Sequence, residues 1–317
     1  MFSWFIRFLA NYWSTTQRVT KLNILTYHRV GELYDSKNPK TIDLSLFKQQ
    51  MGWLNKHFII LSLPEALALQ ERNSLPPRAV CITVDDGYRD SYEFIYRVLQ
   101  EEGIVATFFV STKGIVDGGL WDAEIYSAIF NAPQQVKKVN CGGRTFDISS
   151  FEQRVNSRYQ LTSFTKYLTL VERKKVIDDL KEQTSFHLLE QYFLTEKQIK
   201  IMHENGMSIG AHTHNHPILM KEIDSLAFDE IKQSKDILES IIKEPVEFFA
   251  YPNGKYELDY TDVHVDMVNE LGFRAAFSTD WGSLGNIETE RFKIKRFTPW
   301  DETELSFTLR LALNYRK

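Results

Sequence analysis

The chain has 317 residues, of which 43% are hydrophobic and 25% are charged, and its formal net charge is −4. This length allows a large buried core, and no low-complexity tract indicates disorder. Nucleic acid is not an expected partner, because no dense basic run occurs in this mildly acidic chain. The two cysteines, Cys81 and Cys141, are predicted to be free thiols, since Cys81 lies inside an apolar run.

The first 13 residues, from Met1 to Trp13, are rich in aromatic and aliphatic side chains. This run is too short to cross a bilayer and lacks the layout of a cleavable signal peptide. Its polar residues recur at helical spacing, which predicts an amphipathic helix that either lies on a membrane surface or covers one end of the fold. We treat residues 1–20 as a separate segment and residues 21–317 as the main domain. The expected compartment is the cytoplasm, with membrane association as an alternative.

From residue 22 onward, short apolar and β-branched runs alternate with amphipathic helical stretches. The predicted strands cover residues 22–28, 58–61, 80–84, 104–110, 207–211, 246–251, 273–277 and 292–297. The predicted helices cover residues 44–57, 64–69, 91–102, 195–205, 225–242, 259–271 and 301–314. Such alternation is typical of an α/β protein with a parallel sheet, either open or closed into a barrel.

The alternation stops between Gly118 and about Glu190. This stretch contains charged amphipathic segments and a predicted hairpin over residues 136–148, with Cys141-Gly142-Gly143 as its turn. We interpret it as a mostly helical insertion on one loop of the main domain.

Two adjacent carboxylates, Asp85 and Asp86, follow the apolar run Val80–Val84 and precede Gly87. The pattern predicts a buried strand that ends in a tight turn, and on this stretch alone an ordinary Asp-Gly turn is the simpler interpretation. Neighbouring carboxylates repel each other, however, and a bound cation relieves that repulsion. One carboxylate would then bind the metal while the other accepts a proton.

Three histidines follow a later strand in Gly210-Ala211-His212-Thr213-His214-Asn215-His216. A helical turn after the strand would place His212 and His216, four positions apart, on one side, with His214 pointing away. Two imidazoles and one carboxylate suit Zn²⁺ and leave a position open for water. The competing interpretation is a solvated polar turn with incidental histidines.

Together, the Asp85-Asp86-Gly87 and His212-x-x-x-His216 motifs resemble the first two signature motifs of the polysaccharide deacetylases, carbohydrate esterase family 4. The resemblance covers about residues 22–297 and implies a distorted (β/α)7–8 barrel whose metal-dependent chemistry removes N-acetyl groups from amino sugars. It implies that Asp86, His212 and His216 hold a divalent metal, with Zn²⁺ expected first and Co²⁺, Ni²⁺ or Mn²⁺ as alternatives. Asp85 would be the general base that takes a proton from water.

The run Phe249–Gly254 resembles the third motif of the family. The resemblance implies that the backbone amide of Asn253 donates to the oxyanion, although Pro-Asn-Gly is also a plain turn sequence. We expect the aromatic side chains of Tyr251 and Trp281, and of Trp121, to be available for stacking on sugar rings, or else to be packing residues.

The chain departs from the family pattern in three places. Ala250 occupies the position of the arginine that orients the base, Phe277 that of an aspartate in the fourth motif, and no histidine follows His264 to act as the general acid. We predict that His28 replaces the acid, because first and last strands are neighbours in a closed barrel. A histidine that merely caps the strand is the alternative. Arg296 or Arg29 is predicted to replace the missing arginine.

The Tyr27-His28-Arg29 run resembles an N-terminal motif of a subgroup with permuted motif order, which includes deacetylases of poly-N-acetylglucosamine. The leading functional hypothesis is therefore removal of N-acetyl groups from a polysaccharide, an oligosaccharide or a lipid-linked sugar. Two alternatives stay open. One is an amidohydrolase of a cyclic imide or small N-acyl compound, and the other is an inactive glycan-binding relative.

Overall fold

The computed structural model describes residues 2–15, 19–32, 37, 41–186 and 191–317. At its centre is an eight-stranded parallel sheet in the order β1-β5-β6-β9-β10-β11-β12, with β4 paired to the start of β5. Its strands are β1 (Asn23–Tyr27), β4 (Ile59–Ile60), β5 (Ala79–Val84), β6 (Thr107–Val110), β9 (Ser208–Ala211), β10 (Phe248–Ala250), β11 (Ala275–Trp281) and β12 (Ile294–Arg296).

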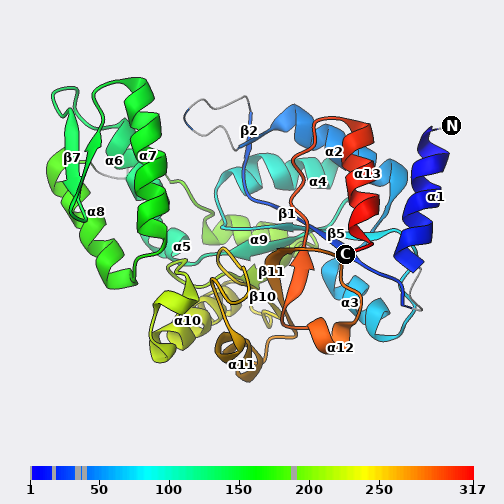
Figure 1. The fold of residues 1–317 in the computed structure, drawn as a ribbon. Coiled ribbons are helices and arrows are strands. Elements are labelled where there is room, and N and C mark those ends of the chain that lie inside the picture. Colours follow the sequence, from blue (N-terminus) through cyan, green and yellow to red (C-terminus); the bar gives the residue numbers. More distant parts are fainter. Residues whose placement is uncertain (1, 16–18, 33–36, 38–40, 187–190) are drawn as a thin grey trace.

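The two edges of this sheet meet next to Phe297. The Thr26 N–H donates to the Phe297 carbonyl at 2.9 Å, and the Phe297 N–H donates to the Ile24 carbonyl at 2.7 Å. The last strand therefore lies beside the first and nearly closes the sheet into a barrel (Figure 1). The predicted α/β barrel fold is confirmed, and so is the expected proximity of the first and last strands.

Helices surround the barrel and follow the sequence pattern closely. They are α2 (Leu44–His57), α3 (Leu63–Glu71), α4 (Arg97–Glu101), α5 (Lys113–Asp117), α9 (Glu196–Glu204), α10 (Asp224–Ile242), α11 (Asp262–Glu270), α12 (Ile287–Glu290) and α13 (Glu304–Asn314). Asp43 caps α2 as predicted, because its side chain accepts a hydrogen bond from the Ser45 N–H at 2.7 Å. Before α4, residues Ser91–Tyr96 form a π-helical segment where a single α-helix was expected. Two short strands, β2 (Val30–Gly31) and β3 (Ile42–Asp43), and a 3₁₀ turn, Leu219–Lys221, complete the barrel region.

The insertion forms a lobe at one end of the molecule (Figure 1). It contains α6 (Trp121–Phe130), β7 (Lys138–Cys141), β8 (Arg144–Asp147), α7 (Phe151–Lys166) and α8 (Leu170–Thr184). The strands β7 and β8 pair antiparallel, which confirms the predicted hairpin. This lobe has its own cluster of buried side chains, drawn largely from residues 120–193 and distinct from the barrel's main core. Residues 187–190, at the predicted end of the insertion, lie outside the described chain.

The N-terminal segment forms the helix α1 (Phe2–Thr15), which packs against α13. Ile6, Ala10 and Ser14 are fully buried on its inner face, so the interpretation of this segment as a helix that covers part of the fold is confirmed. In the described part of the chain, no helix is both long and apolar enough to cross a membrane. Cys81 and Cys141 are both buried free thiols, as predicted.

Candidate metal and catalytic site

The end of β5 places two carboxylates at the mouth of the barrel. All six residues of β5 are buried, and the chain then turns at Asp86 (φ 77°) and Gly87 (φ 82°), both in the left-handed region. A Cβ at Gly87 would lie 2.6 Å from Val110 Cγ1, so the turn requires glycine for both its φ and its close approach to β6. This turn directs the side chains of Asp85 and Asp86 to different partners.

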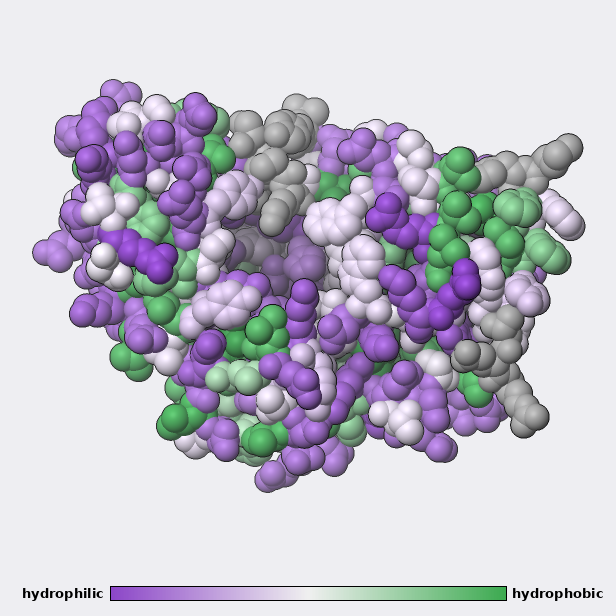
Figure 2. Space-filling model, viewed as in Figure 1, coloured by the Kyte–Doolittle hydropathy of each residue, from purple (hydrophilic) through white to green (hydrophobic). Residues whose placement is uncertain are grey.

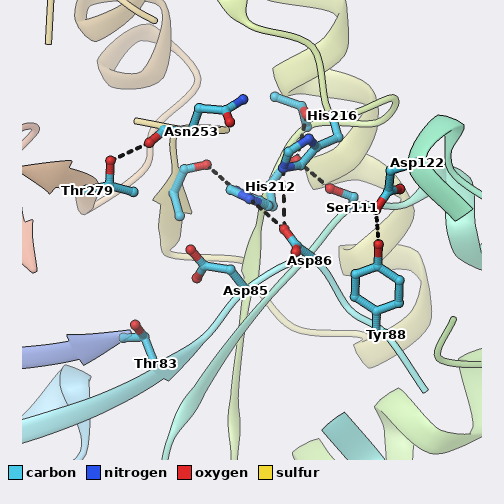
Figure 3. Close-up of polar contacts among 12 residues, drawn as sticks. Thr83, Asp85, Asp86, Tyr88, Ser111, Asp122, His212, His216, Asn253 and Thr279 are labelled. Atoms are coloured by element: carbon cyan, nitrogen blue, oxygen red, sulfur yellow. Dashed lines mark hydrogen bonds and ion pairs between the residues drawn. The ribbon is translucent and has the colours of Figure 1, made fainter. Parts of the chain in front are cut away.

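Asp86 faces His212 and His216 across the barrel mouth (Figure 3). Its Oδ1 lies 3.4 Å from His212 Nε2 and 3.3 Å from His216 Nε2. The three potential ligand atoms all lie within 4.8 Å of one another. The Nδ1 of His212 is 2.7 Å from the Ala250 carbonyl, which can only accept, so Nδ1 carries the proton and Nε2 is free to act as a ligand.

The loop from His212 to His216 is not the helical turn that the spacing predicted. Thr213 (φ 62°) and His216 (φ 54°) both adopt left-handed backbone, and no helix is present at residues 212–216. Buried Glu230 fixes this loop: its carboxylate accepts from the Asn215 N–H at 2.7 Å and from the Asn215 amide at 2.6 Å. Two left-handed residues, rather than one helical turn, bring the imidazoles together.

The donor set fits a divalent metal ion. Burial lowers the pKa of His216, as does the nearby His212, and these effects outweigh the contact with Asp86. Burial raises the pKa of Asp86, but the two imidazoles that face its Oδ1 outweigh it, so that pKa lies well below its usual value. A neutral imidazole and an ionised carboxylate are the protonation states in which these groups bind metals. Asp86, His212 and His216, predicted as ligands from the sequence, are therefore placed together in a usable form.

Asp85 forms a buried, bidentate ion pair with Arg296. The Arg296 Nη1 and Nη2 atoms lie 2.7 and 2.6 Å from the two carboxylate oxygens, and both side chains are almost completely buried. Arg296 also donates through Nε to the Ser278 carbonyl at 2.9 Å. Burial raises the pKa of Asp85, but the charge and hydrogen bonds of Arg296 outweigh it, so the pKa is lowered.

Of the two arginines considered from the sequence, the structure brings Arg296, and not Arg29, to Asp85. The Arg29 Nε lies 2.7 Å from Asp90, and its guanidinium stacks 4.3 Å from the Tyr88 ring centroid. Arg296 therefore supplies the guanidinium that pairs with Asp85 in a chain that has Ala250 at the third-motif position.

His28 follows β1 and lines a cavity of about 290 Å³ that reaches Asp86. Among the described residues that line this cavity, His28 is the only histidine. The sequence reasoning missed most of the other lining residues, although Thr298 and Trp300 follow a strand end and so carried the same signal as His28. The lining residues are Thr26, Tyr27, His28, Arg29, Thr41, Ile42, Asp86, Tyr88, Asp122, Arg158, Thr298 and Trp300.

The aromatic residues expected to stack on sugar are not brought into this cavity. Tyr251 is fully buried, stacks on Tyr260 at 3.7 Å and donates to the Phe292 carbonyl at 3.0 Å, so of the two expectations for its side chain, packing is confirmed and stacking on a sugar is excluded. Trp121 is buried under the Arg173 guanidinium, which excludes stacking there too. Trp281 is 42% exposed at the end of β11 but is not among the described residues that line the cavity.

Asn253 lies in the loop that directly follows β10. Its backbone is left-handed (φ 60°), and its carbonyl accepts a hydrogen bond from the Thr279 hydroxyl (Figure 3). The preceding strand ends at Ala250, whose carbonyl binds His212, so this loop is tied to the metal-ligand group. The role of its amide as an oxyanion donor stays a prediction.

The insertion reaches the site through two polar side chains that the sequence did not single out. Asp122, near the start of α6, accepts a hydrogen bond from the Tyr88 hydroxyl (Figure 3). Arg173 of α8 donates to the carbonyls of His216 at 3.0 Å and Asn215 at 3.3 Å. Arg173 is 3% exposed, but in the sequence it lies within a run of charged helix residues and cannot be told from a surface arginine.

Comparison with known proteins agrees with this geometry. A family model described as polysaccharide deacetylase matches residues 72–276. The poly-beta-1,6-N-acetyl-D-glucosamine N-deacetylase of Staphylococcus epidermidis is 24% identical over 245 residues, which cover 69% of this chain and 81% of that protein. The Streptococcus pyogenes deacetylase PplD in complex with acetate shares the fold with a TM-score of 0.61 at 21% identity, covering 88% of this chain and 92% of that one. IcaB from Ammonifex degensii also shares the fold, with a TM-score of 0.59 at 19% identity, covering 94% of this chain and 97% of that one. The chain therefore belongs to the polysaccharide deacetylase family and is a hydrolase that acts on carbon–nitrogen bonds other than peptide bonds.

Proposed function

We propose that this enzyme removes N-acetyl groups from an amino-sugar-containing glycan with the help of a divalent metal ion, Zn²⁺ being the first candidate. The observation that carries the proposal is the pairing of Asp85 with Arg296 directly beside the Asp86, His212 and His216 group. A base and three metal ligands converge at one barrel mouth that opens into a cavity.

Asp86, His212 and His216 would hold the metal, whose Lewis acidity would lower the pKa of a water molecule and polarise the amide carbonyl. Asp85 accepts the proton that the water loses as its oxygen attacks the carbonyl carbon. Arg296 keeps Asp85 ionised and orients both of its oxygens. The backbone N–H of Asn253 is the proposed donor to the oxyanion.

His28 completes the reaction by protonating the departing amine. When the carbon–nitrogen bond breaks, the nitrogen leaves with the bonding electron pair, and a proton from His28 makes it a neutral amine. Acetate and the free amino sugar are the products. His28 is an exposed side chain at the cavity wall, so it can meet the substrate nitrogen directly.

The cavity lining favours a sugar over a small apolar amide. Polar and charged groups such as His28, Arg29 and Asp122 line the cavity together with Trp300, whose ring is 53% exposed, and this mixture suits a ligand with hydroxyl groups and apolar ring faces. The relative from S. epidermidis is named for its action on poly-beta-1,6-N-acetyl-D-glucosamine. A polymer or oligomer of N-acetylated amino sugar is the substrate class we propose.

The test is acetate release by the purified enzyme from N-acetylated oligosaccharides, lipid-linked sugars and a cyclic imide panel, each with and without chelator. We expect release from a glycan that chelator abolishes and added Zn²⁺, Co²⁺, Ni²⁺ or Mn²⁺ restores. In Asp85→Asn, turnover should be lost while elemental analysis still finds near-stoichiometric metal. Activity on imides alone, or glycan binding without any turnover, would contradict the proposal.

A further inference from the structure

The outer face of α1 carries a group of exposed aromatic side chains. Trp4, Phe5, Phe8 and Tyr12 are 69%, 50%, 52% and 59% exposed, and the Trp4 and Phe8 rings stack with centroids 5.6 Å apart. Figure 2 shows the surface over α1 as a hydrophobic region at the end of the molecule opposite the insertion. Contiguous apolar patches of this kind on a folded protein mark contact sites rather than ordinary surface.

The opposite face of α1 holds the helix rigidly on the barrel. Ile6 and Ala10 are fully buried, and the Ser14 carbonyl accepts from the Lys21 N–H at 2.8 Å. The Arg78 N–H donates to the Ser14 hydroxyl at 3.1 Å. The helix has therefore already buried one face, and its aromatic face is directed away from the protein.

Basic side chains surround this aromatic face, and α1 itself contains no acidic residue. The Arg7 guanidinium donates to the Lys56 carbonyl at 3.1 Å, and the Arg316 guanidinium lies 5.7 Å from the Trp13 ring centroid. The Arg78 guanidinium donates to the carbonyl of His57, the residue after Lys56, at 2.8 Å, so the guanidinium groups of Arg7 and Arg78 bind adjacent carbonyls.

We propose that α1 is a docking surface for a membrane containing anionic lipids, and that it holds the enzyme on that surface without crossing it. Tryptophan and tyrosine favour the interface between headgroups and acyl chains, and the basic rim complements anionic headgroups. A second copy of this chain fits less well, because a two-fold contact through α1 would bring Arg7 and Arg316 toward their own counterparts. The inference concerns a surface remote from the catalytic groups and does not depend on the proposed function.

The experiment is co-sedimentation of the full chain with phosphatidylglycerol–phosphatidylcholine vesicles, with pure phosphatidylcholine vesicles as the neutral comparison. Wild-type protein should sediment with the anionic vesicles. Trp4→Ser combined with Phe8→Ser should weaken partitioning about tenfold or more. The matched control is Phe151→Ser combined with Tyr167→Ser, which removes two exposed aromatic residues from the insertion and should leave partitioning unchanged.

The charged rim is tested separately with Arg7→Gln and Arg316→Gln. On anionic vesicles each basic residue lost should reduce partitioning about fivefold, with little change on neutral vesicles. Circular dichroism and acetate release from a soluble substrate check that each variant is folded. Undiminished vesicle binding by the Trp4 and Phe8 double variant would overturn the proposal. So would a concentration-dependent dimer that this variant abolishes, since the aromatic face would then belong to a second copy.

Discussion

In the barrel, the proposed catalytic and metal-binding groups follow the ends of short buried strands, whereas the insertion reaches the site through side chains on helices. Asp85 and Asp86 follow β5, and His212 follows β9, so parallel pairing brings them to one edge. The insertion contributes Asp122 and Arg173, which contact barrel residues near the candidate metal ligands. In the proposed mechanism the barrel therefore supplies the reacting groups, and the insertion packs against the loops that carry them.

This difference predicts that substitutions in the two regions will have different signatures. Barrel substitutions should change the rate of the chemical step. Insertion substitutions should change metal affinity or substrate affinity and leave the intrinsic chemistry nearly intact.

Replacing Arg296 with methionine should have the largest effect, because it leaves Asp85 buried and unpaired. We expect a loss of about 3–5 kcal/mol in the free energy of unfolding. Without Arg296, burial dominates and raises the pKa of Asp85. A base works only when ionised, so the acid limb of the pH–rate profile should move to higher pH. Chemical denaturation and a kcat/KM profile against pH measure the two effects.

The double variant with Asp85→Asn and Arg296→Met provides the control. It removes the buried, unpaired carboxylate of Asp85, so the free energy of unfolding should return toward that of the wild type while activity stays lost. An Arg296→Met enzyme with an unshifted acid limb would show that Arg296 does not tune the base.

His28→Ala should reduce kcat for N-acetyl glycan by about 10²–10⁴-fold, because the amine would then leave without its proton donor. An aryl acetate ester, whose leaving group needs no proton, should lose much less. The control is His203→Ala on α9. The His203 Nε2 lies 3.3 Å from the Glu244 carboxylate, and His203 does not line the cavity among the described residues, so this variant should leave both rates unchanged. Equal losses on amide and ester would mean that His28 binds substrate or caps β1 instead.

The barrel residues of this site were largely predictable from the sequence, because the end of a buried strand is recognisable as an apolar run followed by polar residues. An apolar run followed by Asp85 and Asp86, and another followed by His212, locate groups at one edge before any contact is known. The choice between Arg296 and Arg29 was not decidable, since it depends on which side chain points into the closed barrel. The choice between stacking and packing for Tyr251 was not decidable for the same reason, since residue type did not reveal that its ring faces Tyr260 in the core.

The insertion's part was not predictable from one sequence. Arg173 sits among exposed charged neighbours, and only the docking of α8 against the loop after β9 reveals its burial. The backbone of that loop was also predicted wrongly, because histidine spacing alone suits either a helical turn or the left-handed residues Thr213 and His216. Long-range packing decided both.

Arg173→Met should weaken metal binding about 10–100-fold, the usual effect of losing a group that orients a ligand. The carbonyls of Asn215 and His216 would lose their donor, and the loop that carries His216 would loosen. Competition with a chromophoric chelator measures the affinity. The control is Lys174→Met, the next residue along, which is exposed and pairs within α8 with Asp178 at 2.5 Å. Unchanged metal affinity together with a lower Tm would limit Arg173 to stabilising the insertion.

Asp122→Ala should have the smallest effect, raising KM for an oligosaccharide about fivefold, as expected for one lost hydrogen bond of about 1 kcal/mol. Asp122 lines the cavity beside Tyr88 but is neither the proposed base nor the proposed acid. Glu124→Ala is the matched control, since Glu124 lies two residues along α6 and pairs instead with Lys181 at 3.0 Å. Steady-state kinetics at saturating metal separates KM from kcat. A fall in kcat as large as that expected for His28→Ala, with KM unchanged, would place Asp122 in the chemical step. The barrel and the insertion would then not differ in the kinetic step that they affect.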